Sequence, residues 1–407
     1  MKKVLIISNG HPYQGGRATT AYNLQIFLSS INFDTKVLFI NDFNSNGDVD
    51  PENSGNSFNI SYGKPSAYTL VKSLIRKMIS FKISKNIKLT YLIKLVYSKI
   101  KNILPNIKNK KSDTFPPANA LTSIEAFVTE SNFYPDLVIT NSPIFYEISD
   151  KILGKTKTLL IVSSAFPIIK NNLEADSRII LENPDLYKKQ FSKNLINSLN
   201  MTKSQVIFNS QLSYKLYSAY GIRPIKKSVQ YFNFAPYTIS QNKTFFDRKY
   251  DIGFIVSDSR RIVKNSEKMI NLFVAFPERE KIAIGNGTYL MSKIPNIMTL
   301  DLMTQKEVAS FLSEIKLIVI TSYYDCSPSI LSEALLNGCN VLSSKNVGWN
   351  EMLEKSCVVQ NYNDNNEWIE KIDFLLNNKI ENKNFLKIIY NSKNELINLF
   401  NDISVEH

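Results

Sequence analysis

Short apolar segments of the strand type alternate with helix-like stretches along this chain, and this alternation limits the possible folds more than any other feature. VLIIS at 4–8 is followed by a turn at 10–16, by the helix-like TTAYNLQIFLSSI at 19–31 and by KVLFI at 36–40. Strand, glycine-containing loop, helix and strand in this order are typical of the βαβ unit of a parallel sheet. The N-terminal part is therefore predicted to contain a parallel sheet.

The same alternation continues and then starts again near residue 250. We interpret 43–63, rich in Asn, Ser and Gly, as a loop, and 204–222 as a strand followed by a helix. Further strands are predicted at 135–143, 157–164, 250–257, 281–287, 296–301, 316–322 and 339–344. Pro236, Asn242 and a charged run interrupt the periodicity near 235–248, which predicts a linker there.

Two series of this kind in 407 residues predict an α/β protein with two Rossmann-like domains. We expect an N-terminal domain at 1–238 with an insertion at 64–112, and a C-terminal domain at 239–385. A last helix within 386–407 could pack back on the N-terminal domain. Ligands of such sheets bind beyond the carboxyl ends of the strands, so the loops after the strands are the segments to inspect.

The net charge of +13 is concentrated in one segment. Residues 64–112 contain thirteen Lys or Arg and no Asp or Glu, and removing these thirteen from the total of 49 leaves 36 basic residues against 36 acidic ones. Apolar, aromatic and Lys positions recur there at helical spacing, which favours an amphipathic surface on an anionic membrane. A solvated basic face is the plainer alternative. Nucleic acid is a weaker one, since no nucleic-acid-binding motif is present.

Other features exclude several classes of protein. The apolar run Val4–Ile7 is too short for the core of a signal peptide, and no run approaches the roughly 18 residues that span a bilayer. Three cysteines are too few for a disulfide framework, and two histidines exclude a histidine-rich zinc site. These features predict a cytoplasmic protein.

The segment after the strand at 316–322 has the local chemistry of an anion site. Ser327 is predicted to cap a helix, Pro328 suits its first turn, and Asn337-Gly338 ends it. Asp325 then lies in the loop before the helix and Glu333 in its second turn. The free N–H groups at the start of the helix suit a diphosphate, and the two carboxylates suit the hydroxyls of ribose and of a sugar.

Inside this segment an apolar stripe is predicted to pack on the sheet, formed by Ile330, Leu331, Ala334 and Leu335. An isolated Asp-x7-Glu pair is common by chance, and Glu333 on its own could be a surface residue. Position after a strand, with a helix start and stop around it, favours a functional site.

The sequence DCSPSILSEALLNGCNVLSS resembles the E-x7-E region of the retaining GT-B glycosyltransferases of family four. The family usually has Glu first, whereas this chain has Asp325, one methylene shorter. The resemblance implies that Glu333 binds the ribose of the donor and that Asp325 binds the transferred sugar. It also implies two Rossmann-like domains whose parallel sheets face each other across a cleft.

Further residues enter through the same resemblance. Arg260 and Lys264, with Arg261 as an alternative to Arg260, correspond to the Arg and Lys that contact the donor diphosphate, although a solvated loop is the plainer reading. Gly285 and Gly287 correspond to the glycines near the nucleotide base, and the pair Gly15-Gly16 to those that let a backbone approach a phosphate, or to a plain turn. The family often has a His where this chain has Ser163-Ser164. The helix start supplies the remaining candidate donor contacts: Ser327, Ser329, Ile330 and Leu331.

The implied function is that of a retaining hexosyltransferase. It would move a sugar from a UDP- or GDP-sugar to a glycan or lipid-linked acceptor in cell-envelope polysaccharide synthesis. The resemblance implies no cofactor and no essential metal. Residues 64–112 would hold the enzyme at the inner face of the cell membrane, without nucleic acid as a partner. The alternative from another class is a catalytically silent, membrane-associated binding protein of the same fold, and an RNA-associated protein is the weakest alternative.

Overall fold

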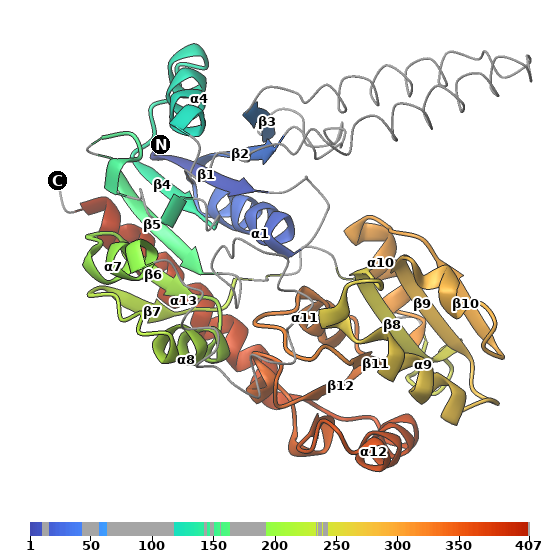
Figure 1. The fold of residues 1–407 in the computed structure, drawn as a ribbon. Helices are drawn as coiled ribbons and strands as arrows, with labels where there is room; N and C mark the ends of the chain where they lie inside the picture. The colour runs from blue at the N-terminus through green and yellow to red at the C-terminus, as the bar shows by residue number, and fades with distance from the viewer. Residues whose placement is uncertain are drawn as a thin grey trace, which may run out of the picture.

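The computed structural model contains two separate parallel sheets with helices around them (Figure 1). It describes residues 1–9, 16–42, 57–62, 118–141, 145–146, 150–154, 156–162, 193–232, 234, 238 and 243–405. The basic segment 64–112 and Gly15 lie outside the described residues, so the predictions made for them stay predictions.

The first sheet has seven strands, all paired in parallel. In spatial order they are β3 (Ser57–Tyr62), β2 (Asp34–Asp42), β1 (Lys3–Asn9), β4 (Leu137–Thr140), β5 (Lys157–Val162), β6 (Gln205–Phe208) and β7 (Lys227–Val229). Its helices are α1 (Gly16–Ser30), α4 (Ala118–Glu130), α7 (Lys193–Met201) and α8 (Gln211–Ala219). The predicted strands at 4–8 and 36–40 are confirmed, and those predicted at 135–143 and 157–164 are observed at 137–140 and 157–162. Uninterrupted apolar runs of this kind suit strands that are buried on both faces.

The second sheet has six strands, again all parallel. In spatial order they are β10 (Ile297–Leu300), β9 (Lys281–Asn286), β8 (Tyr250–Asp258), β11 (Ile315–Ile320), β12 (Asn340–Ser344) and β13 (Val358–Val359). Its helices are α9 (Ser266–Ala275), α10 (Gln305–Leu312), α11 (Ser329–Leu336) and α12 (Asn365–Asn377). The two-domain α/β prediction is confirmed, and β8 and β11 lie side by side at the centre of this sheet.

One prediction is wrong in part, because 57–62 is a strand and not loop. Strand β3 pairs in parallel with β2, with Phe58 opposite Leu38 and Ile60 opposite Ile40. Its apolar residues alternate at period two, but the surrounding Asn, Ser and Gly hide this short pattern. Pairing with the edge of β2 satisfies backbone groups that a loop would leave to water.

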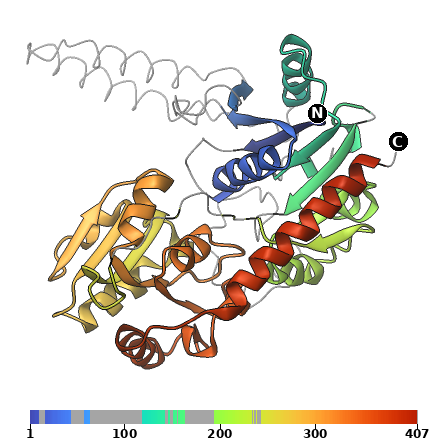
Figure 2. The ribbon, with the colours of Figure 1, turned by 180° about the vertical axis from the view of Figure 1, so that it is seen from behind.

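The last helix, α13 (Lys383–Val405), runs from the second sheet toward the first and along it (Figure 2). The rings of Phe400 and Phe33 lie 6.3 Å apart, and Gln230 Nε2 donates to Glu395 Oε2 over 2.8 Å. Leu396 and Phe400 are completely buried. Helix α13 therefore contributes to the core of the first half.

A second set of contacts joins the two halves near the start of α11. Trp349 Nε1 donates to the carbonyl of Asn209, and the Trp349 ring meets Tyr231 edge to face at 5.2 Å. Tyr324 and Cys326, from the loop after β11, are buried in one apolar cluster with Leu160 and Phe208 of the first sheet and with Tyr217 of α8. The loop that contains Asp325 thus packs directly against the first half.

Among the residues that the structure describes, no helix combines the length and the apolar character needed to cross a bilayer.

Candidate donor site at the carboxyl edge of the second sheet

The neighbouring strands β8 and β11 end at the same edge of the second sheet, and each is followed by a loop with a charged residue. Lys264 ends the short 3-10 helix Ile262–Lys264 after β8, and Asp325 follows β11. The structure brings them together, with Lys264 Nζ 2.6 Å from Asp325 Oδ2. Their side chains are 18% and 20% exposed, so the pair is largely but not completely shielded. This edge is where ligands of open parallel sheets bind.

The backbone around Lys264 is held by the end of β11. Thr321 Oγ1 donates to the carbonyl of Lys264 over 2.9 Å, and the N–H of Tyr323 donates to the carbonyl of Val263 over 2.9 Å. Asn265, with a φ of 47°, caps α9 by accepting from the N–H of Lys268. These bonds place the lysine at the start of a helix, where the helix dipole adds positive potential.

Asp325 is fixed on both its backbone and its side chain. Its N–H donates to Asn346 over 3.2 Å, and its carbonyl accepts from the N–H of Gly348 over 2.7 Å. A Cβ on Gly348 would lie 1.9 Å from the carbonyl oxygen of Cys326, so only glycine allows this approach. Asp325 Oδ1 accepts from the N–H of Ser327 over 3.3 Å. The backbone of Asp325 and its carboxylate are therefore both held in position by hydrogen bonds within the loop.

The start of α11 differs by one residue from the prediction. The N-cap is Pro328, without a side-chain cap, and not Ser327. The N–H of Ser327 is instead turned toward Asp325, since a carboxylate two residues earlier forms a competing local turn. The helix ends as predicted, with Asn337 as C-cap and Gly338 at a φ of 71°.

The other predicted residues of α11 divide between the core and its start. Leu331 and Ala334 are buried at 1% and 0% exposure, and the N–H of Leu331 donates to the carbonyl of Pro328. Ser329 and Ile330 form the first turn and are partly buried. The side chain of Leu331 is packed in the core, so only its backbone could contact a donor there.

Glu333 is partly buried in the second turn of α11. Burial raises the pKa of its carboxyl to about 7, against the opposing effect of hydrogen bonds with Ser329 and Gln305. Gln305 Nε2 lies 3.5 Å from Glu333 Oε1. The Gln305 contact is long, and a carboxylate can accept more than two hydrogen bonds, so a ligand with paired hydroxyls could donate to it as well.

Replacing Glu333 with Gln is expected to make the protein relatively more stable as the pH rises. The folded-state pKa lies above the ordinary value of 4.5, so the stability linked to this group is complete below about pH 4.5 and is lost up to about pH 7. Glutamine cannot ionise, and the variant should gain about 1–3 kcal/mol over the wild type between pH 4.5 and 8. Urea unfolding across this range measures the difference.

Glu307 is the control for this titration. Hydrogen bonds from the backbone and side chain of Thr304 lower the pKa of its carboxyl, so its contribution to stability is present at neutral pH and lost in acid. Glu307→Gln should therefore lose relative stability as the pH rises. A pH-independent difference for Glu333→Gln contradicts the buried-carboxylate interpretation.

The two arginines after β8 are placed differently from Lys264. Arg260 is bound to Asp258, with Nε 2.8 Å from Oδ1 and Nη2 2.9 Å from Oδ2, and its side chain is 56% exposed. The guanidinium lowers the pKa of the Asp258 carboxyl. Arg261 is partly buried. Arg260 is thus a solvated cation beside the site, already partly neutralised by Asp258.

The glycines after β9 have structural explanations. Gly285 has a φ of 135°, and a Cβ there would lie 1.8 Å from the carbonyl oxygen of Val256, where the pairing of β8 and β9 is irregular. Gly287 has a φ of 81°, and a Cβ would meet the side chains of Ser259 and Arg260 at 2.8 Å each. Both let the loop pass close to the end of β8, which sets the position of Arg260.

Gly285→Ala is expected to destabilise the protein by about 3–5 kcal/mol, because the new Cβ meets backbone and not a movable side chain. Gly221→Ala is the matched control. Its φ is 88° but nothing lies within 4 Å of a Cβ, so the change should cost only about 1–2 kcal/mol. Thermal unfolding of both variants tests this, and equal losses would show that φ alone matters.

In the first half, Gly16 begins α1, but its predicted partner Gly15 and the pair Ser163-Ser164 lie outside the described residues. Sequence reasoning missed Tyr231, which is 1% exposed and close to α11. Burial raises the pKa of Tyr231, opposed by a hydrogen bond with Ser332 and reinforced by the charge of Glu333. No local pattern connects positions 231 and 332, so the sequence held no signal for this contact.

No family model and no curated protein matches the chain. Solved structures do. Sucrose-phosphate synthase from Thermosynechococcus elongatus has a TM-score of 0.64 at 12% identity, covering 99% of each chain. Anabaena HepE in complex with UDP and glucose has a TM-score of 0.61 at 13% identity, covering 99% of this chain and 100% of HepE. WaaG, described as a glycosyltransferase of lipopolysaccharide biosynthesis, has a TM-score of 0.55 at 10% identity, covering 96% of this chain and 94% of WaaG.

These matches extend over nearly the whole chain, and they agree with the two parallel sheets and their flanking helices. The chain has the GT-B fold, with two Rossmann-like domains.

Proposed function

We propose that this protein is a retaining glycosyltransferase that takes a hexose from a nucleotide diphosphate-sugar. The observation that carries the proposal is the Lys264–Asp325 pair beside the start of α11, at the carboxyl edge of the second sheet. A lysine, a helix start and a partly buried Glu333 together suit a nucleoside diphosphate joined to a sugar. The similarity to HepE, whose structures contain UDP and UDP-glucose, supports a UDP-sugar as the first donor to test.

The chemistry follows from where charge develops. When the bond between the sugar and the diphosphate breaks, the leaving group gains negative charge. Lys264, Arg260 and the N–H groups at the start of α11 would stabilise that charge. They are already in position, so no reorganisation of solvent is required as the charge develops. Glu333 would accept hydrogen bonds from the ribose hydroxyls. No cofactor and no essential metal is part of this proposal.

Acceptor and place are proposed on other grounds. A glycan or lipid-linked acceptor in cell-envelope polysaccharide synthesis fits a cytoplasmic enzyme held at the inner membrane face by 64–112. WaaG is described as involved in lipopolysaccharide biosynthesis, which supports an envelope acceptor. A TarM variant was solved with UDP and α-GlcNAc-glycerol, which supports a sugar-bearing acceptor or product beside UDP. Flotation with anionic and neutral liposomes over a salt series tests the membrane part. Deletion of 64–112 should abolish binding to anionic liposomes. Unchanged flotation would contradict the membrane role of this segment and leave the proposed transferase activity unaffected.

Calorimetry with UDP-glucose and GDP-mannose, followed by a mass-spectrometric screen of sugar donors, tests the activity. We expect binding of one sugar nucleotide and slow hydrolysis or transfer. Binding without any turnover would favour the catalytically silent binding protein, and binding of neither class would contradict the proposal.

A further inference from the structure

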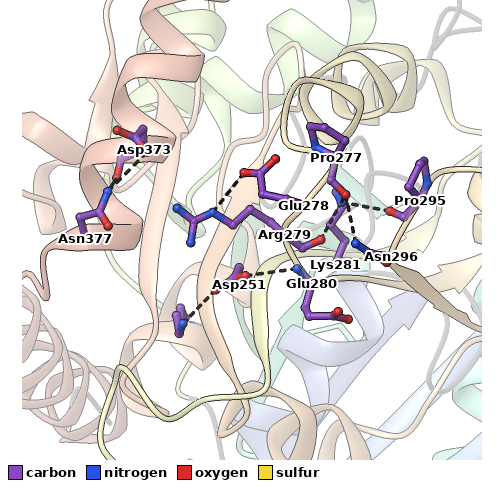
Figure 3. A network of polar contacts seen from close by, with 11 residues as sticks. Asp251, Pro277, Glu278, Arg279, Glu280, Lys281, Pro295, Asn296, Asp373 and Asn377 are labelled. Carbon is purple, nitrogen blue, oxygen red and sulfur yellow. Dashed lines mark hydrogen bonds and ion pairs between the residues drawn. The ribbon is translucent and has the colours of Figure 1, made fainter.

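Two Lys–Asp ion pairs connect β8 and β11, one at each end of the strands. At the amino ends, Lys316 Nζ donates to Asp251 Oδ1 over 2.8 Å, and Asp251 Oδ2 accepts from the N–H of Glu280 over 3.1 Å. Figure 3 shows Asp251 and Glu280 in this network, close to the carbonyl cage of Pro277, Arg279 and Pro295 around Lys281. The side chains of Asp251 and Lys316 are 13% and 15% exposed.

The pair at the carboxyl ends is built in the same way. One oxygen of Asp325 binds Lys264 Nζ and the other accepts a backbone N–H, that of Ser327, over 3.3 Å. Each pair joins one lysine to one aspartate, and in each the second carboxylate oxygen accepts a backbone N–H. The side chains of the two pairs are also buried to a similar extent. They differ in position, since only the second lies at the ligand-binding edge of the sheet.

A diphosphate that binds Lys264 draws away the strongest donor of Asp325. The carboxylate keeps the longer bond to Ser327 and is about four-fifths shielded from water. A shielded carboxylate short of donors costs free energy, and its charge also repels a phosphate that approaches the lysine. A free nucleoside diphosphate bears both costs. A sugar nucleotide carries hydroxyl groups next to the diphosphate that can donate to Asp325 in place of the lysine.

We propose that Asp325, through its ion pair with Lys264, makes this site prefer the sugar-bearing nucleotide over the free nucleoside diphosphate. The inference rests on the proposed function and gives Asp325 a role in specificity in addition to sugar contact. Product release would benefit, because after the sugar has left Asp325 competes with the diphosphate for Lys264, and the ion pair forms again as the diphosphate leaves.

Asp325→Asn tests this, because the amide keeps the shape of the side chain and removes its charge. Calorimetry with UDP and UDP-glucose measures both dissociation constants. If the wild type binds GDP-mannose instead, GDP and GDP-mannose are used. We expect the variant to bind the free diphosphate about tenfold more tightly. The ratio of the two constants, free diphosphate over sugar nucleotide, should fall by at least the same factor.

Asp251→Asn is the matched control at the opposite end of the same strands. It should lower the thermal midpoint about as much as Asp325→Asn and leave the ratio unchanged. Weaker or equal binding of the free diphosphate by Asp325→Asn, or an unchanged ratio, overturns the inference while the proposed function stands. A wild type that binds no nucleotide contradicts the proposed function, and the inference with it.

Discussion

Lys264→Met is expected to lower the rate of sugar transfer by about 100- to 1000-fold, the usual effect of removing one preorganised group that stabilises developing negative charge. Methionine keeps an unbranched side chain only one atom shorter than that of lysine and removes the cation. Thr321 Oγ1 donates to the backbone carbonyl of Lys264, and this bond does not involve the lysine side chain, so the loop should stay in place. Steady-state kinetics with the donor found in the screen measures the loss, which should appear mainly in kcat.

Lys316→Met is the control that separates an effect on sugar transfer from an effect on stability. It removes the cation of the other ion pair and leaves Asp251 as unpaired as Lys264→Met leaves Asp325. Both variants should unfold at lower temperature, but only Lys264→Met should lose transfer. Equal losses of activity would mean that the ion pairs matter only for folding, and full activity in Lys264→Met would remove the lysine from the mechanism.

Glu333→Ala should reduce transfer by at least about 100-fold while the protein stays folded. Each hydrogen bond from a neutral hydroxyl to a carboxylate contributes roughly 1.5–3 kcal/mol, and a ribose offers two. Because burial raises the pKa of Glu333 to about 7, its charged form is already disfavoured, and removing it relieves a cost to folding. Transfer at fixed donor concentration and the thermal midpoint should therefore change in opposite directions.

Glu370→Ala provides the comparison, because this residue lies on the exposed side of α12. It should change neither transfer nor the thermal midpoint appreciably. Unchanged transfer by Glu333→Ala would remove Glu333 from the donor site, and an unfolded variant would show that the residue serves the helix and not the ligand.

Much of the fold could be predicted because strands such as 4–8 and 316–322 are continuous apolar runs, which a doubly covered parallel sheet requires. The shortest strands could not. β7 has three residues and β13 has two, and both lie at the edge of a sheet, where pairing and not composition decides the conformation. The sequence favours a loop at β3, because its few apolar residues stand among Asn, Ser and Gly.

The residues of the candidate site could be named from the sequence one by one, but their arrangement in space could not. Asp325 and Glu333 lie in one short segment whose helix start and stop residues can be recognised in the sequence, so a local pattern identifies both. The bond between Lys264 and Asp325 spans 61 positions and exists because β8 and β11 are neighbours in the sheet, which no spacing in the sequence reveals. The contact between Tyr231 and Ser332 depends in addition on how the two halves pack.

The course of α13 has a consequence for how the chain matures during synthesis. The surface around Phe33 and Gln230 is complete only when residues near 395–400 arrive, since these supply Glu395 and Phe400. At translation rates of 5–20 residues per second, the first half waits roughly 10–30 s after residue 230 with an uncovered apolar surface. Folding of the N-terminal half thus depends on a segment that is synthesised 165 residues after Gln230, and a product truncated before Glu395 would expose an apolar surface of the kind that chaperones bind.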